Sequence, residues 1–265
     1  MIRKLSPLLL LIGLFSCQSD PYQVDVDNVK LSVQYNNLDS AFRYAHDNQR
    51  LRQIKALLQT DFDLSQFSFP YALQVSTQTD TAFLNGLKRL YAHPFNIQVS
   101  QALDKQEKWR LQTFREIEAG LKRLHFLAPK APIAKHIYFS YTQFAASAYA
   151  SKKGIVLGQE RYLGATHPVI SALPPQQFYE WIKEGMAPEY ATSDALLSWL
   201  STNMLKTTDE NLASEMIRWG KLLALLEIIC PEVDMHRHLR YSEQDFQWAL
   251  KAERGFWEYL VDQQF

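Results

Sequence analysis

The chain has 265 residues, of which 47% are hydrophobic and 13% aromatic, and its 28 basic and 28 acidic residues give a formal charge of zero. The apolar fraction is large enough to form a buried core, which excludes an intrinsically disordered chain. The sequence has no basic stripe and no glycine-rich strand-to-helix loop, so it argues against a nucleic-acid partner and against the usual phosphate-binding sites.

The first residues predict export and lipidation. A positively charged start precedes an apolar run over residues 8–15. This run is shorter than the roughly 20 residues of a membrane span, but it fits the central region of a secretory signal. Leu14 and Ser16 precede Cys17 in the manner of a lipobox. We therefore predict a lipoprotein signal peptide that ends at Ser16 and fatty acylation, such as palmitate, at Cys17. The alternative is an ordinary cleaved signal with an incidental cysteine.

After the signal we expect a lipidated cysteine and polar tether over residues 17–26, then a single globular domain over residues 27–265. Cys230, the second cysteine, lies in an apolar stretch. We interpret it as a small buried hydrophobic residue, although two cysteines in an exported protein also allow one disulfide.

Apolar periodicity predicts both strands and helices in the first half of the domain. Alternating apolar and polar residues are typical of a half-buried strand, and apolar residues at every third or fourth position are typical of an amphipathic helix. His93-Pro94 ends one of the helices, because the residue before a proline disfavours the helical conformation. The predicted elements are a strand over residues 24–33, helices over residues 38–58, 80–90 and 100–126, and an aromatic, proline-broken loop over residues 67–71.

The second half is expected to contain two buried strands followed almost entirely by helices. Residues 137–141 and 154–158 favour strands, and residues 145–149 fit a turn or a short helix. Thr207 and Glu210 match a capping box, and Ser242 is a candidate helix N-cap. The predicted helices cover residues 177–183 and 192–204, residues 207–230, and residues 242–260. Together these elements predict an α+β fold that is mostly helical with a small sheet.

From residue 158 the sequence resembles a known family. Residues 158–164 read Gly-Gln-Glu-Arg-Tyr-Leu-Gly and include Glu160 and Tyr162. This segment is similar to the Gly-Leu-Asp-x-Tyr-Leu-Gly element of the gliding motility lipoprotein B (GldB) family of Bacteroidota. Gln159 and Glu160 replace the Leu and Asp of that element.

Further motifs follow in the order found in that family. The helix with Glu215 and Lys221 is similar to the family's Leu-x-x-x-Met-Ile-x-x-Gly-Lys helix, and four later residues fit its C-terminal pattern. These four residues are Tyr241, Trp248, Glu253 and Trp257. The resemblance covers nearly the whole chain, although relatives usually continue into a further tail, so this chain is either a short divergent member or an incomplete one.

The resemblance implies an envelope lipoprotein needed for gliding over surfaces, a process linked in that phylum to type IX secretion. It also implies a fold distantly similar to zinc peptidases (zincins) with a His-Glu-x-x-His helix. That motif is absent, and residues 168–235 contain no histidine. Such a zinc site needs two histidines one helical turn apart with a glutamate as general base. We therefore expect a zincin-like scaffold without metal, cofactor or enzymatic activity.

Two histidines remain as possible zinc ligands. His236 and His238 are two positions apart, but they lie between Pro231 and Ser242, which predicts a solvated polar loop. A divergent zinc-dependent hydrolase that uses these ligands is the alternative function. No Gly-x-Ser-x-Gly nucleophile motif is present.

Two glutamates share helix faces with apolar residues. Glu215 lies on the face of Leu212 and Trp219, and Glu253 lies on the face of Trp257. A carboxylate on an apolar face needs a partner or takes up a proton, and a pair of them can perform acid–base chemistry. We favour a structural network for both.

The sequence thus predicts a non-catalytic lipoprotein that supports gliding motility and the associated secretion machinery by binding envelope proteins. It would be held to the membrane by its lipid and would not bind nucleic acid. Gln18 after the lipidated cysteine favours the outer membrane over the inner one, and we expect the protein on the periplasmic side rather than on the cell surface. The candidate structural or binding residues are Glu160, Tyr162, Glu215, Lys221, Tyr241, Trp248, Glu253 and Trp257. The six tryptophans and thirteen tyrosines also allow a carbohydrate-binding protein, but we expect them to fill the core.

Overall fold

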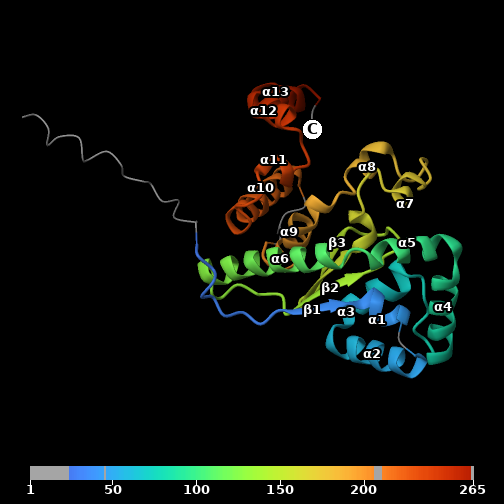
Figure 1. Cartoon of the computed structure of the whole chain (residues 1–265). Coiled ribbons are helices and arrows are strands. Elements are labelled where there is room, and N and C mark those ends of the chain that lie inside the picture. Colours follow the sequence, from blue (N-terminus) through green and yellow to red (C-terminus); the bar gives the residue numbers. More distant parts are fainter. Residues whose placement is uncertain (1–23, 45, 206–210, 264–265) are drawn as a thin grey trace, which may run out of the picture.

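The computed structural model describes residues 24–44, 46–205 and 211–263. The predicted signal peptide, Cys17, most of the tether and the predicted capping box at Thr207 lie outside these residues. Helices dominate the described part of the chain, and its strands form one mixed sheet (Figure 1), which confirms the predicted α+β class.

The sheet explains why its two central strands are almost wholly apolar. Across the described residues its order is β1 (Gln34–Asn37), β2 (His136–Ser140), β4 (Gly154–Gly158) and β3 (Ala148–Ala150). The first three strands are parallel, and β3 is antiparallel to β4. Parallel strands are normally covered on both faces. Accordingly, every residue of β2 and β4 except His136 is buried.

The helices fall into two groups along the chain. Between β1 and β2 they are α1 (Leu38–Tyr44), α2 (Asp47–Thr60), α3 (Phe62–Gln66), the π-helical η1 (Phe67–Ala72), α4 (Asp80–Ala92), α5 (Pro94–Asp104) and α6 (Glu107–Leu127). After β4 they are the 3-10 helix η2 (Gln159–Tyr162), α7 (Pro168–Ser171), α8 (Glu180–Glu184), the 3-10 helix η3 (Pro188–Tyr190), α9 (Ala191–Asn203), α10 (Leu212–Ile229), α11 (Met235–His238), α12 (Glu243–Lys251) and α13 (Glu253–Asp262).

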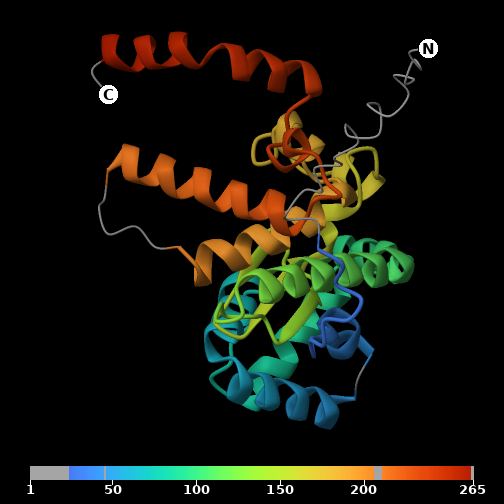
Figure 2. The ribbon, with the colours of Figure 1, turned by 90° about the vertical axis from the view of Figure 1, so that its left-hand side faces the viewer.

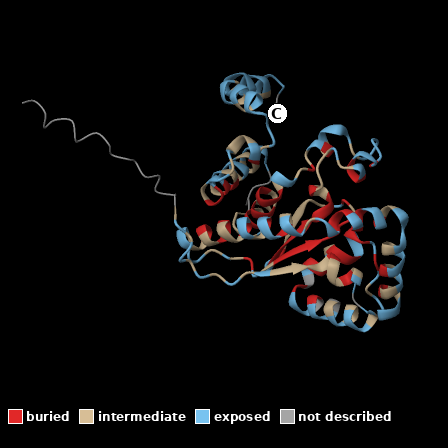
Figure 3. Ribbon diagram, in the orientation of Figure 1, coloured by how far each residue is buried: buried red, intermediate tan, exposed pale blue. Residues whose placement is uncertain are grey.

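Two hydrophobic clusters cover the two faces of the sheet, as the buried segments in Figure 3 indicate. Side chains along a strand alternate between its faces. Tyr138 and Val156 therefore join the cluster that contains the buried residues of α1, α4 and α5. Ile137 and Ile155 join the cluster that contains the buried residues of α6, α9 and α10. Helices α1, α4 and α5 thus build most of one layer, and α6, α9 and α10 build most of the other.

The predicted strands over residues 137–141 and 154–158 are confirmed, but the strand over residues 24–33 is wrong. Burial alternates along residues 24–33 as expected, yet the strand pairing begins only at Gln34. A local hydrogen bond takes the place of strand pairing here. The backbone N–H of Asp27 donates to the Asp25 side chain at 3.0 Å. Short polar side chains often compete with regular structure in this way. The sequence also missed β3, where a turn or short helix was expected.

Three predicted elements have different boundaries or a different type. Residues 38–58 form two helices, because His46 is extended (ψ 156°) between α1 and α2. The predicted loop over residues 67–71 is a π-helix with Pro70 inside it. Its Phe69 ring packs against Phe42 and Phe83 at centroid distances of 5.5 and 5.4 Å, so core burial compensates for the proline. The helix expected over residues 100–126 is interrupted between α5 and α6.

Helix ends in the C-terminal half follow capping chemistry. The helix predicted over residues 192–204 is confirmed as α9, and the Ser242 hydroxyl accepts from the backbone N–H of Asp245 at 3.1 Å, as predicted for an N-cap. α10 begins after Asn211, whose side chain accepts from Ser214 N at 2.8 Å. The predicted last helix is divided at Ala252 into α12 and α13.

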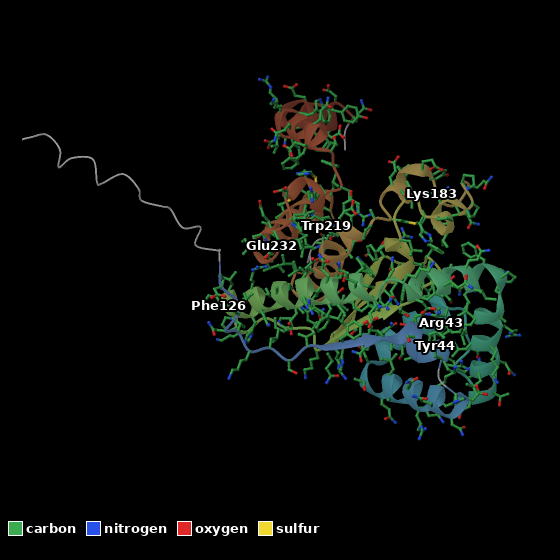
Figure 4. All side chains as sticks on the ribbon, in the orientation of Figure 1. Arg43, Tyr44, Phe126, Lys183, Trp219 and Glu232 are labelled. Atoms are coloured by element: carbon green, nitrogen blue, oxygen red, sulfur yellow. The ribbon has the colours of Figure 1, made fainter. Side chains whose placement is uncertain are left out.

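A buried ion-pair network joins α1 to α5. The Arg43 guanidinium donates to both carboxylate oxygens of Asp104, at 2.8 and 3.0 Å, and to Asp39 at 2.7 Å. Tyr44 also donates to Asp104, at 2.6 Å, and Figure 4 labels Arg43 and Tyr44 beside each other. Burial raises the pKa of Asp39, and Arg43 opposes that shift, so Arg43 keeps a buried carboxylate compensated.

We expect Arg43→Gln to lower the free energy of unfolding by about 3 kcal/mol, because removing one partner leaves a buried charge without compensation. Lys55→Gln is a suitable control, since Lys55 and its partner Asp80 are both exposed; it should change stability by less than about 1 kcal/mol. Urea denaturation measures both changes, and equal effects of the two substitutions would contradict the assignment.

Candidate protein-binding surface

The segment from Gly158 to Tyr162 forms a buried turn at the carboxyl end of β4. A Cβ atom on Gly158 would lie 2.2 Å from the carbonyl oxygen of Ala146, so only glycine fits this approach. Glu160 is completely buried, and its Oε1 accepts from the backbone N–H groups of Thr142 at 3.0 Å and Phe144 at 2.8 Å, and from the Thr142 hydroxyl at 2.5 Å. Glu160 therefore fastens the chain after β4 to the turn after β2.

Burial raises the pKa of Glu160 to about 7, although the hydrogen bonds from Thr142 and Phe144 oppose the shift. Its second oxygen, Oε2, has no hydrogen-bond partner among the described residues. The carboxyl group faces the interior rather than solvent, which supports a structural role for this residue over a binding rim.

Tyr162 begins a second chain of contacts, which leads to the C-terminal helices. Its hydroxyl donates to Asp194 Oδ2 on α9 at 2.9 Å, and Arg240 donates to the same oxygen at 2.6 Å. Arg240 also lies over the ring of Tyr190 at 4.7 Å. Burial raises the pKa of Tyr162, which keeps the phenol a neutral donor. These contacts fix residue 240, two positions before the cap of α12, against α9.

The two candidate metal-binding histidines have separate partners. They belong to the single turn α11 instead of the predicted loop. His238 is buried and forms a 2.8 Å hydrogen bond with Ser193, whereas His236 pairs with Glu243 at 3.1 Å. Across the described ranges, no group of three or more His, Cys, Asp or Glu side chains is arranged to hold a metal ion. The structure thus gives no support to the zinc hydrolase alternative.

Cys230 is buried, as the sequence predicts, and burial raises the pKa of its thiol to about 12. A thiol in this state is a poor nucleophile at neutral pH.

α10 packs on the body through its second half. Leu222, Leu226 and Ile229 are buried, whereas Leu212 and Trp219, the apolar residues that share a face with Glu215, are exposed. Trp219 lies beside α9 (Figure 4), where it lines a small groove with the α9 residues Leu197 and Ser198. Glu215 pairs with Arg218 at 3.0 Å, and Lys221 is exposed. α10 therefore presents apolar and charged side chains to solvent.

The helices α12 and α13, which we call the C-terminal arm (residues 243–262), stand apart from the sheet and its helical layers in two views (Figures 1 and 2). None of the described side chains of either helix is buried, and Figure 3 shows the arm as an almost continuous exposed segment. Trp248 is 71% exposed, Trp257 48% and Val261 74%. Of the eighteen large hydrophobic residues that are exposed in the described chain, ten lie at or after residue 212.

The arm carries apolar residues on more than one face. At 100° per residue, Phe246 and Leu250 share one face of α12, and Trp248 lies on the opposite face. On α13, Phe256 and Trp257 lie on one broad apolar face, where their rings pack at a centroid distance of 5.9 Å. An amphipathic helix normally packs its apolar face against another surface, and on both helices of the arm that face is exposed.

The sequence-predicted site residues divide into two groups. Glu160 and Tyr162 are interior residues that hold neighbouring segments, whereas Tyr241, Trp248, Glu253 and Trp257 are exposed at the arm or just before it. Sequence reasoning missed the pair of Asp194 and Arg240. These residues are 46 positions apart, so their interaction produces no local pattern in the sequence. It also missed Phe256 and Tyr259 on α13, although their spacing is visible in the sequence.

We expect the stability of the protein to depend on pH through Glu160. The folded pKa is near 7 and the ordinary value is 4.5, so the folded state binds this proton more tightly than the unfolded chain. The free energy of unfolding therefore falls as the pH rises from about 4.5 to about 7 and is level above that range. Glu160→Gln removes this titration and keeps an oxygen that can accept from Thr142 and Phe144.

Between pH 5 and pH 7, the unfolding free energy of the wild type relative to Glu160→Gln should fall by roughly 2 kcal/mol. Glu253→Gln, on the exposed arm, is the control. Its unfolding free energy should change with pH in parallel with that of the wild type. Urea titrations at several pH values measure this, and parallel curves for Glu160→Gln would refute the buried-carboxyl assignment.

Comparison with known proteins agrees with the resemblance seen in the sequence. Residues 19–265 match the profile of a family described as gliding motility protein GldB. No curated protein and no solved structure gives a match. In the described ranges, no helix is both long and apolar enough to span a membrane. Because the match covers nearly the whole sequence, the chain belongs to the GldB family of gliding-motility lipoproteins.

Proposed function

We propose that this lipoprotein supports gliding motility by binding envelope proteins through its C-terminal arm and that it performs no catalysis. The observation that carries the proposal is the exposure of the large aromatic and apolar residues of α12 and α13. Large exposed apolar patches mark interaction sites, and tryptophan and tyrosine are the residues most enriched at the energetic centres of interfaces.

The charge of the arm defines the chemistry of the partner. Residues 243–262 contain five acidic and two basic side chains, a formal charge of −3. Helices that lie in a membrane surface usually have basic polar faces and one apolar face. The polar residues of the arm instead carry net negative charge, which favours a protein groove with an apolar floor and a basic rim.

The lipid on Cys17 gives this contact its strength. Each buried methylene contributes about 0.8 kcal/mol, so the two or three acyl chains of a lipoprotein hold the body at the membrane. A tether turns the binding of a second membrane-bound protein into a nearly intramolecular event, which raises the effective concentration without new contacts. Gln18 after this cysteine supports the outer rather than the inner membrane as the location, and we place the protein on its periplasmic side.

Replacing Trp248 and Trp257 together by alanine should abolish gliding and the crosslinks of the arm to envelope proteins in intact cells, because both rings would be part of the interface. Both side chains are exposed, so the melting temperature should change little. Gln244→Ala, on the same arm, is the matched control and should keep both gliding and crosslinks. Normal gliding by the double variant would contradict the proposed role of the arm.

Replacing Cys17 by alanine should release the protein from the membrane fraction and abolish the incorporation of labelled fatty acid. Ser19→Ala changes a neighbouring residue and should affect neither measurement. A Cys17→Ala protein that remains acylated and membrane-bound would disprove the anchor assignment while leaving the arm untouched.

A further inference from the structure

A groove of about 540 Å³ lies at the carboxyl edge of the parallel strands, toward which β2 points in Figure 1. Helices α4 and α5 form one wall, and the loop between α7 and α8 forms the other. The segment after η1 and the turn after β2 complete the lining. Its volume is in the range of about 300–1,000 Å³ that is usual for ligand sites. No residue of the C-terminal arm lines it, so it is independent of the proposed protein-binding surface.

Three residues that line the groove have left-handed backbone conformations. Gln74, Gln143 and Phe144 have φ values of 53°, 51° and 64°, and in the described chain only one other non-glycine residue, Arg240, has a positive φ. Each such residue costs about 1 kcal/mol or more, and strained residues cluster at binding sites. A hydrogen bond from the backbone N–H of Phe144 to the buried Glu160 side chain holds Phe144 in this strained conformation.

The groove has a cationic side chain without a nearby counter-charge. Arg89 lines it from the last turn of α4, His93 lines it from the residue after this helix, and the described lining contains no acidic side chain. Arg89 is exposed and forms no ion pair or hydrogen bond with any described residue. A free guanidinium beside a groove of this kind is suited to a carboxylate, which it can bind through two parallel hydrogen bonds.

The rest of the lining combines aromatic rings with carboxamides. The Phe144 ring packs between Phe95 and Phe178, at centroid distances of 6.2 and 5.9 Å, and forms an apolar surface. Gln74 and Gln177 are exposed at the groove. A carboxamide both donates and accepts hydrogen bonds, so it matches a peptide group, whereas a fatty acyl chain offers it no partner.

We propose that this groove binds the carboxyl-terminal end of a peptide whose last side chain is apolar. The terminal carboxylate pairs with Arg89, the apolar side chain lies on the rings around Phe144, and the glutamine carboxamides bind the peptide groups. The occupant is a peptide rather than a fatty acid because the groove offers polar partners along its length as well as one cation at its edge.

The test uses the full chain and a fluorescein-labelled Gly-Ala-Ala-Phe peptide with a free carboxylate. Fluorescence polarisation should show saturable binding, and both amidation of the peptide and Arg89→Gln should weaken it about tenfold or more, since hydrogen bonds between charged groups contribute about 1.5–3 kcal/mol. Lys88→Gln removes the neighbouring charge, which points to Asp47 on α2, and should leave the affinity unchanged.

The proposal is overturned if the free-acid peptide fails to saturate, if the amidated peptide binds equally well, or if Lys88→Gln weakens binding as much as Arg89→Gln. Displacement of the peptide by decanoate at equal concentration would assign the groove to a fatty acid and would also overturn it. Thermal denaturation of both variants provides the folding control. Because the arm takes no part, the result is independent of the Trp248 and Trp257 experiment.

Discussion

The positions of the groove and of the C-terminal arm both depend on the contacts around the Glu160 carboxylate. One of its oxygens accepts three hydrogen bonds from Thr142 and Phe144, so it joins the end of β4 to the turn that follows β2. That turn contains Gln143 and Phe144, whose left-handed conformations shape the groove. Two residues after Glu160, Tyr162 reaches Asp194, which in turn holds Arg240 before the arm. A single buried segment thus positions the groove on one side and the base of the arm on the other.

This arrangement explains why a strongly polar group is retained in the interior. A fully buried carboxyl group costs stability unless its hydrogen bonds are satisfied, and here the raised pKa records that cost. The buried carboxyl group fixes the position of the turn after β2, because three donors from that turn converge on one of its oxygens and define the path of the chain. An apolar side chain of the same volume could fill the space at Glu160 but could not hold the backbone of Thr142 and Phe144.

The sequence predicted what depends on local pattern and failed where distant residues decide. The strand over residues 154–158 and the cap at Ser242 follow from local composition, and both are confirmed. The pairing of β3 with β4 depends on partners that periodicity cannot identify. The π-helix at Pro70 persists because Phe69 reaches a core built from distant helices. In residues 24–33 the alternation of burial is correct, but no strand of the described chain pairs with them and the Asp25 side chain binds the local backbone.

The same distinction applies to the candidate site. Trp248 and Trp257 were identified by their place in a motif, and the helical stripe suggested a buried face, yet the arm is exposed. Periodicity reports that a surface is apolar but not whether the chain itself or another protein covers it. In this chain the buried ends of β2 and β4 hold the segments that lead to the groove and the arm, and the sheet lies between two hydrophobic layers. The body can therefore remain folded while both surfaces are open, which is what the proposed tethered binding role requires.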